Sequence, residues 1–407
     1  MKPMSLPLLL YYGMFGMPLA MVALPVYVYL PKFYADRAAL PLSMIGAVLL
    51  AARLAAAFID PLLGWWIARG QGAYARFIGL ALPLLLAGFV ALFHPPVLGQ
   101  GAALAWFFIT LMLVNLGLGI ATIAHQSWGA ALTQAASERA RITGMREACA
   151  LAGVVLAAGV TGALGYGALS LVFAVALLVG AALLLVLAVR PACADLVPDW
   201  RALWAPCGNP RFRALFAVLI VNGVASAIPA TLFLFFASDH LRLPSLAGVF
   251  LILYFGAAAL SMPFWVAAAG RFGEARAWVG GMLLSCLVFV CCAALDAGAA
   301  LAFGAICAAS GLALGADLAL PPALLAGVIA KAGHAGQREA AYFGLWNWGV
   351  HLTLALAAGI ALPLLGWWGY APGATDTGAL VTAYALLPCA LKLVAAAMLW
   401  RAPLHDC

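Results

Sequence analysis

The apolar stretch AARLAAAFIDP, residues 51–61, contains two ionisable side chains, Arg53 and Asp60. They are seven residues apart, so they lie on one face of a helix. An ionisable side chain deep in a bilayer costs about 2.5–3.5 kcal/mol on insertion scales, and such residues persist where they pair or line a water-filled path. The stretch therefore predicts a membrane-spanning helix that carries a buried, functional pair of charges.

The composition of the whole chain points to a membrane protein. Of its 407 residues, 67% are hydrophobic and 8% are charged, whereas an average soluble domain has about 25% charged residues. This composition excludes a water-soluble fold. Apolar runs of about 20 residues, each long enough to cross about 30 Å of hydrocarbon, recur along the chain. They predict twelve transmembrane helices, centred near Met21, Ala55, Leu85, Leu113, Leu156, Leu178, Leu219, Ala257, Leu284, Gly311, Leu354 and Lys392.

The basic residues predict the orientation of the chain, because cytoplasmic loops carry an excess of Lys and Arg. With Met1 in the cytoplasm, the outside loops hold only Lys32, Arg37 and Arg242. The inside loops and tails then hold fourteen basic residues: Lys2, Arg69, Arg76, Arg139, Arg141, Arg190, Arg201, Arg211, Arg213, Arg271, Arg276, Lys331, Arg338 and Arg401. We expect a multi-pass protein of the bacterial inner (cytoplasmic) membrane with both termini cytoplasmic. We also expect the first span, from Leu6, to be a retained helix rather than a signal peptide.

The chain divides into two halves that share a pattern. The polar, proline-containing segment 191–212 predicts a cytoplasmic linker between a first six-helix bundle, 1–190, and a second, 213–407. An offset of 202 residues aligns Phe33 with Phe235, Ala35 with Ala237, Gly46 with Gly248, Leu49 with Leu251, Pro61 with Pro263 and Arg69 with Arg271. Such repeats favour a substrate site near the midplane between two halves that rock against each other. Arg53 and Asp60 align with Phe255 and Met262, so we expect ion coupling in the first half.

Several kinds of chemistry lack a signal in the sequence. The nine cysteines show no paired or metal-type spacing, so we expect no disulfide and no metal. There is no glycine-rich phosphate loop, which argues against ATP as the energy source. A membrane enzyme or a non-transporting sensor is a third hypothesis, but no clustered nucleophile and base and no signalling domain support it. The net charge of +7 follows from the loop asymmetry, so we expect no nucleic-acid partner.

A small set of polar side chains lies within the apolar spans: Arg53, Asp60, His125, Gln126, Arg146, Glu147, Asp317, His351 and Lys392. A buried carboxyl group binds a proton more readily than one in water, and a nearby arginine opposes this. We therefore expect Asp60 to carry a proton and Arg53 to tune it, with His351 as a second titrating group. For Lys392 we favour a side chain that reaches the membrane interface. We favour a transport role for Asp317 and His351.

Aromatic residues form a second set. Most membrane Trp and Tyr residues anchor a protein at the lipid–water interface. Tyr12 in the first span, Trp128 at the end of the fourth, and Trp346 with Asn347 at the start of the eleventh are candidates for contact with a solute. Trp128 and Trp346 can form stacking platforms for a sugar ring or another flat ligand.

Several motifs resemble one transporter family. They are Phe33-Tyr34-Ala35-Asp36, Ile45-Gly46, Leu49-Leu50, Ala52-Arg53, Asp60-Pro61-Leu62-Leu63-Gly64-Trp65, Gly315-Ala316-Asp317-Leu318-Ala319-Leu320-Pro321 and Tyr342-Phe343-Gly344-Leu345-Trp346. Together they resemble the glycoside-pentoside-hexuronide cation symporters of the major facilitator superfamily, over nearly the whole chain. The resemblance implies an all-α membrane protein with twelve transmembrane helices in two pseudo-symmetric six-helix bundles. It also implies a coupling cation on helix 2 and sugar contacts on helices 1, 4, 5 and 11.

The resemblance is partial at the site residues. Asp60 stands where one cation-site Asp is expected, but Ala56 and Ile59 replace the other two expected ligands. Sodium needs several oxygen ligands and a proton needs one carboxylate, so we prefer proton coupling and keep sodium as possible. Trp128 and Arg146 match sugar-contact positions, and His351 occupies the usual helix 11 lysine position. Pro18 and Ala124 replace two family carboxylates.

The sequence thus predicts a secondary transporter that works by alternating access and has no enzymatic activity and no cofactor. The first hypothesis is proton-coupled symport of a sugar, a glycoside or another small polar organic solute. The alternative, suggested by the apolar replacements Ala56, Ile59, Pro18 and Ala124, is a transporter of an amphipathic molecule such as a lysolipid, a siderophore or a drug. We expect a monomer in the lipid bilayer. The expected solute contacts are Trp128, Arg146, His351, Tyr12, His125, Gln126, Trp346, Asn347 and Asp317.

Overall fold

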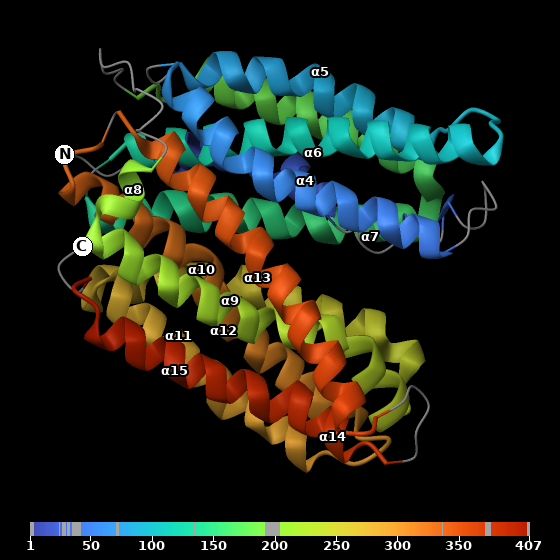
Figure 1. The fold of residues 1–407 in the computed structure, drawn as a ribbon. Coiled ribbons are helices and arrows are strands. Elements are labelled where there is room, and N and C mark those ends of the chain that lie inside the picture. The colour runs from blue at the N-terminus through green and yellow to red at the C-terminus, as the bar shows by residue number, and fades with distance from the viewer. Residues whose placement is uncertain are drawn as a thin grey trace. The chain divides into compact units, whose positions relative to one another are not determined.

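The computed structural model describes residues 4–23, 25–26, 30, 33–34, 42–70, 73–133, 135–191, 204–335, 337–370 and 376–404. Within these helices, the side chains of residues 42, 43, 46, 50, 53, 136, 137, 162, 163, 358, 359, 361–363 and 366 lie outside the description. All the regular structure in the described part of the chain is helical (Figure 1).

The described helices group into two compact units. Unit 1 comprises Met1–Pro206 with Ile329–Trp348, and unit 2 comprises Cys207–Val328 with Gly349–Cys407. The predicted linker falls largely on residues 192–203, which lie outside the described residues. The sequence did not predict that residues 329–348, from the end of the tenth span into the eleventh, group with the first unit. The helix that starts at Glu339 therefore contributes residues to both units.

Unit 1 contains the following helices, in chain order: α1 (Leu6–Gly13), α2 (Gly16–Met21), α4 (Leu42–Ala68), α5 (Tyr74–Phe93), α6 (Gln100–Ala131), α7 (Ala136–Ala182), the π-helix η2 (Leu183–Leu187), α8 (Ala205–Gly208, on the border with unit 2) and the first part of α13 (Glu339–Trp367). Unit 2 contains α9 (Pro210–Phe235), η4 (Phe236–His240), η5 (Pro244–Leu246), α10 (Ala247–Phe272), α11 (Glu274–Phe289), η6 (Val290–Ala294), α12 (Ala300–Lys331), the rest of α13, α14 (Gly378–Val381), η7 (Thr382–Leu386) and α15 (Leu387–Arg401).

Ten of the predicted spans are confirmed by helices that are long and apolar enough to cross a membrane. Among the described residues they are Ala47–Ala68, Tyr74–Phe93, Gln100–Ala131, Glu138–Thr161, Leu164–Leu187, Pro210–His240, Pro244–Phe272, Glu274–Ala294, Ala300–Lys331 and Gly378–Arg401. The two remaining predicted centres, Met21 and Leu354, lie in α2 and α13. Residues 24 and 27–29, shortly after Met21, lie outside the described part. α13 has 29 residues, a length that suffices for a span.

The first apolar helix is interrupted between two glycines. α1 ends at Gly13 and α2 begins at Gly16, and the Met14 N–H donates to the Leu10 carbonyl oxygen at the break. Pro18 is the third residue of α2, where its missing backbone N–H removes no bond within that helix, and the Met17 N–H donates to the Met14 carbonyl oxygen. Together these residues allow the chain to bend while it packs against α7.

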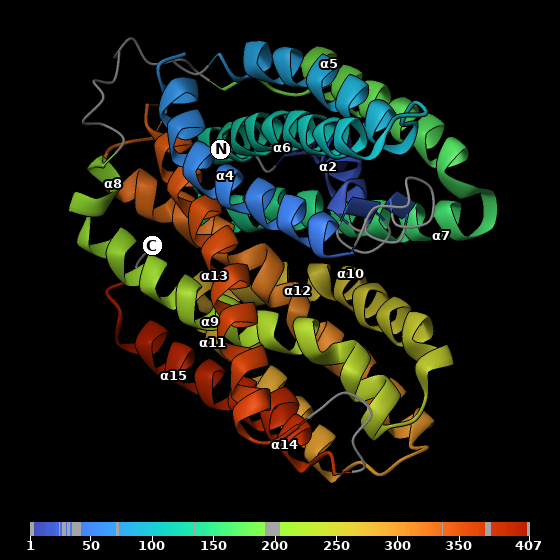
Figure 2. The same cartoon turned by 45° about the vertical axis from the view of Figure 1, so that its right-hand side comes forward.

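In unit 1, α6 is the central helix. It packs against α5 and α4, and it also contacts α7 and α2 (Figure 2). The helices α1 and α2 pack against α7. α7 holds two predicted spans in one helix, separated by a kink at Gly165, where φ is 78°. Because α6 has neighbours on several sides, its polar residues can meet side chains from several helices.

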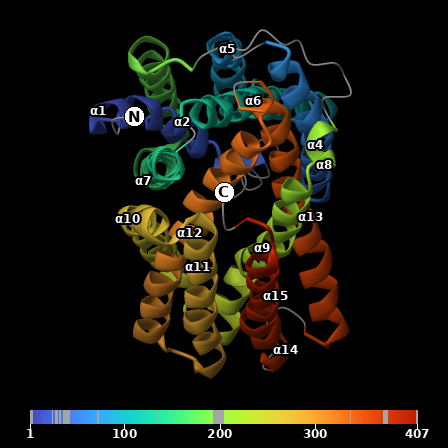
Figure 3. The same cartoon turned by 90° about the vertical axis from the view of Figure 1, so that its left-hand side faces the viewer.

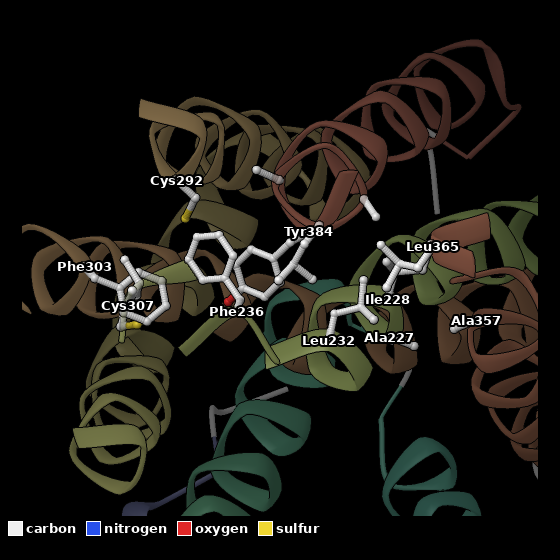
Figure 4. Close-up of a cluster of buried hydrophobic side chains, with 14 of the residues drawn as sticks. Ala227, Ile228, Leu232, Phe236, Cys292, Phe303, Cys307, Ala357, Leu365 and Tyr384 are labelled. Carbon is white, nitrogen blue, oxygen red and sulfur yellow. The ribbon is translucent and has the colours of Figure 1, made fainter. Parts of the chain in front are cut away.

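In unit 2, α15 packs against both α9 and α11 (Figure 3). The core at one end of the unit is aromatic: Phe236 stacks on Tyr384 with ring centroids 4.0 Å apart, and Phe303 lies beside Phe236 (Figure 4). These rings come from η4, η7 and α12. Burial of large apolar side chains against one another therefore joins three segments that are far apart in the sequence.

Candidate functional site

Asp60 lies in the middle of α4, where only 4% of the residue is exposed. Its carboxyl group faces α6 at Gly119: a Cβ atom added to that glycine would lie 3.1 Å from Asp60 Oδ1. A glycine at this position lets the carboxyl group approach the neighbouring helix closely. The structure thus places a buried acid between two membrane-spanning helices of unit 1. Arg53 also lies in α4, but its side chain is outside the described residues, so its predicted pairing with Asp60 stays a prediction.

Tyr12 and His125 bind each other across α1 and α6. The Tyr12 hydroxyl donates to the His125 carbonyl oxygen at 2.9 Å, and His125 Nε2 lies 2.9 Å from the Tyr12 carbonyl oxygen, to which it donates. Their ring centroids are 4.4 Å apart, and both residues are fully buried. This reciprocal pair fixes the position of α1 on α6.

Arg146 and Glu147 form an ion pair at the start of the fifth span, on α7. Arg146 Nε lies 3.0 Å from Glu147 Oε1, and Arg146 is buried. The guanidinium group is also close enough to Tyr12 to interact with its hydroxyl. The structure therefore brings together three sequence-predicted residues, Tyr12, His125 and Arg146, and joins Glu147 to them.

Trp128 is buried on α6, one turn after His125. Its indole N–H donates to the Val189 carbonyl oxygen at 2.8 Å, and 1% of the residue is exposed. Trp128 thus uses its hydrogen-bond donor inside the protein, at the end of the sixth span. Trp346 is also buried, in the part of α13 that belongs to unit 1.

Gln126 and Asn347 form an amide pair in unit 1. Asn347 Nδ2 donates to Gln126 Oε1 at 3.1 Å, and both side chains are half-buried. A side-chain amide has two N–H donors and an oxygen that accepts. The pair therefore keeps further donor and acceptor capacity, which is suited to the hydroxyl groups of a polar solute.

Asp317 is the centre of a polar cluster in unit 2. Its Oδ2 lies 2.6 Å from Lys392 Nζ, and its Oδ1 accepts from Trp278 Nε1 at 2.7 Å and from Asn222 Nδ2 at 3.3 Å. Lys392 Nζ also donates to Ser226 Oγ at 3.0 Å. Side chains from α9, α11, α12 and α15 therefore meet at one buried carboxylate.

The Asp317 cluster corrects one prediction and adds residues that the sequence did not suggest. The prediction that Lys392 reaches the interface is wrong: the residue is 6% exposed and forms an internal ion pair. The pair satisfies both charges inside the bundle, so the side chain gains nothing by extending to the interface. Asn222, Ser226 and Trp278 were missed. A polar amide within an apolar span was the signal that would have identified Asn222.

His351 is half-buried in the part of α13 that belongs to unit 2, the unit that also contains the Asp317 cluster. Among the described residues, no group of three or more His, Cys, Asp and Glu side chains has a geometry that could hold a metal ion. The arrangement is suited to holding a proton on a buried carboxyl group and to hydrogen bonding a polar solute.

A comparison with protein families identifies the chain over almost its entire length. Residues 11–406 match the family model described as MFS/sugar transport protein. A curated relative, the uncharacterized symporter YjmB of Bacillus subtilis (strain 168), is 30% identical over 127 residues. That match covers 30% of this chain and 27% of YjmB, so it spans about a quarter of the relative.

Solved structures share the fold. The crystal structure of a bacterial homologue of the iron transporter ferroportin, in an outward-facing state, matches with a TM-score of 0.73 and 16% identity and covers 97% of this chain and 98% of that chain. The E. coli fucose:proton symporter FucP matches with a TM-score of 0.70 and 16% identity, and covers 98% of this chain and 99% of that chain. These likenesses show the major facilitator fold, as the sequence predicted. The chain therefore belongs to the MFS/sugar transport protein family and is a multi-pass membrane protein with the major facilitator fold.

Proposed function

We propose that this protein is a proton-coupled symporter of a sugar, a glycoside or another small polar organic solute. The observation that carries the proposal is Asp60, a carboxyl group that is 4% exposed and lies in an apolar span against Gly119 of α6. A group of this kind binds and releases a proton when its access to water changes during alternating access. The family description, a symporter relative and the fold of a fucose:proton symporter support this proposal.

The solute contacts are proposed from the polar groups of each unit. In unit 1 we assign Gln126 and Asn347 as the hydrogen-bonding pair. The other proposed contacts of this unit are Tyr12, His125, Arg146, Trp128 and Trp346. In unit 2 we assign Asp317 and His351. Half-buried amides are suited to direct contact with hydroxyl groups, whereas the buried Tyr12–His125 pair is suited to positioning α1.

The remaining features of the proposal follow from the sequence. The protein lies in the bacterial inner membrane with both termini in the cytoplasm, because this orientation puts most basic residues inside. It works as a monomer, since one chain contains both halves of the transport path. It needs no cofactor besides the coupling ion, for which we prefer a proton to sodium because the second helix offers one carboxylate.

Uptake by purified protein in proteoliposomes tests the proposal. A thermal-shift screen against sugars, glycosides, organic acids and lysolipids, with and without sodium, first identifies a solute. Uptake of that solute is then measured with an imposed inside-alkaline pH gradient. We expect the wild type to concentrate the solute and Asp60→Asn to equilibrate it without concentrating it, because an amide carries no exchangeable acid proton.

The matched control is Asp376→Asn, the same change at an exposed residue between α13 and α14. It should concentrate the solute as the wild type does. An Asp60→Asn variant that still concentrates solute refutes the coupling role. Stabilisation by lysolipids alone, together with protection of cells from toxic hydrophobic compounds, would instead support the alternative of an amphipathic solute.

A further inference from the structure

Cys286 and Cys389 lie against each other within unit 2. Cys286 Sγ is 3.5 Å from the Cys389 carbonyl oxygen, and Cys389 Sγ is 3.7 Å from the Cys286 carbonyl oxygen. Each thiol therefore contacts the backbone of the other residue, across the packed helices α11 and α15. Both are free thiols, and each residue is 8% exposed.

The surroundings of the pair favour reaction with an uncharged oxidant. The thiols lie within the spans Glu274–Ala294 and Gly378–Arg401, so charged thiol reagents are excluded by the hydrocarbon.

We propose that Cys286 and Cys389 form a redox-modification site at which a small, membrane-permeant hydroperoxide creates a disulfide between α11 and α15. One thiol loses its proton, and its sulfur attacks a hydroperoxide oxygen. The O–O bond breaks and a sulfenic acid forms, while the leaving oxygen takes up the proton that the thiol lost and departs as water or an alcohol. The second thiol then attacks that sulfur. The S–S bond forms, the S–O bond breaks, and the hydroxyl group leaves as water with the second thiol's proton. The two sulfurs together lose two electrons, which the hydroperoxide gains.

The arrangement of the other cysteines of unit 2 provides an internal comparison. Cys292 and Cys307 are also buried, in the aromatic core of the same unit. Figure 4 shows them well apart, on η6 and α12. Burial in the same bundle is thus common to both sets, whereas the reciprocal contact belongs to Cys286 and Cys389. If only Cys286 and Cys389 become linked, their contact explains the reaction; if Cys292 and Cys307 also become linked, peroxide oxidises buried thiols of this unit in general.

The test treats the full-length protein in nanodiscs with hydrogen peroxide and maps its cysteines without reduction. Chymotrypsin cuts after Leu287 and Phe289 and so separates Cys286 from Cys291. We expect a linked peptide that contains Cys286 and Cys389, disappears after treatment with a reductant, and is accompanied by an upward shift of the protein's Tm. The shift is expected because the disulfide closes a long loop in the unfolded chain.

Two controls keep the result interpretable. Cys389→Ser should form no linked peptide and show no peroxide-dependent shift in Tm, while Cys292→Ser should behave as the wild type does. The proposal fails if peroxide oxidises the exposed Cys207 while Cys286 and Cys389 stay unlinked. It also fails if Cys292 and Cys307 link as readily as the proposed pair. The mapping of the wild type decides the matter even where a serine variant does not fold.

Discussion

Asp317 illustrates how single side chains hold a charge inside this protein. Its carboxylate accepts from an ammonium, an indole and an amide, at distances of 2.6–3.3 Å. Removing water from two opposite charges costs several kcal/mol per ion, and the cost is recovered only where geometry and additional hydrogen bonds are good. The Asp317–Lys392 pair meets both conditions, so its contribution is best tested by removing the two charges separately and together.

We expect Lys392→Met to lower the thermal stability of the purified protein strongly, because it leaves the Asp317 carboxylate buried without its cation. Breaking such a pair costs about 3–5 kcal/mol. The double variant Asp317→Asn with Lys392→Met should be more stable than Lys392→Met alone. Lys331→Met, at an exposed lysine, serves as the control. If Lys392→Met were as stable as the wild type, the Asp317–Lys392 ion pair would contribute nothing to the free energy of unfolding.

His334, between α12 and α13, provides a pH-dependent test outside the spans. Its Nδ1 lies 2.9 Å from the Tyr342 hydroxyl, and Arg338 Nη1 lies 3.4 Å from its Nε2. Partial burial, and then the Arg338 charge, lower the pKa of His334 below its ordinary value of 6.5. The unfolded chain thus binds this proton more readily than the folded protein does. Stability contributed by neutral His334 is present above the ordinary pKa and is lost as the pH falls through the lower, folded pKa.

We therefore expect the Tm of the wild type to fall between about pH 7 and about pH 5.5, and the fall to be shallower in His334→Gln. Differential scanning fluorimetry of both proteins at several pH values measures the difference. An equally steep fall in the variant would assign the acid sensitivity to other groups.

Among the helices, α6 does most to assemble unit 1. It carries Gly119 against Asp60, His125 against Tyr12, and Gln126 against Asn347. One helix thus meets α4, α1 and α13 with residues spread over two turns. Small displacements of α6 would move all three contacts together, so the packing of this helix is coupled to the geometry of the candidate site.

Gly129→Val tests this packing. A Cβ atom at Gly129 would overlap the Tyr12 hydroxyl, which is held by the His125 carbonyl oxygen. Overpacking of this kind costs about 1–3 kcal/mol. We expect a lower Tm and weaker solute binding in the thermal-shift assay. Gly101→Ala in the same helix is the matched control, because a Cβ atom there meets nothing within 4 Å. Unchanged solute binding in a folded Gly129→Val variant would show that solute binding does not depend on how α1 packs against α6.

For the entire protein, the orientation in the membrane is the property to test. Arg76→Cys at the start of α5 and Asp376→Cys before α14 place single thiols at exposed positions of opposite predicted sides. In a cysteine-free background, an impermeant maleimide added to whole cells should label Asp376→Cys and should label Arg76→Cys only after the membrane is permeabilised. The reverse pattern would place the termini outside.

Features of this protein that depend on one segment of the chain could be predicted from the sequence, whereas contacts between residues far apart in the chain could not. Spans such as Tyr74–Phe93 were located correctly because hydropathy and length are properties of one segment. By contrast, Lys392 was misjudged because its partner lies 75 residues away, on another helix. Cys286 and Cys389 are 103 residues apart, and their spacing suggested no pairing.

The amino-acid order alone thus specified a chain of membrane-spanning helices, a repeated pattern and a short inventory of buried polar groups. It could do so because the thickness of the hydrocarbon layer and the cost of a charge within it act on each segment independently. Which of these groups meet was set by folding. The rotation and register of each helix depend on side-chain packing against helices far away in the chain, and those choices brought Asp317 to Lys392 and Tyr12 to His125.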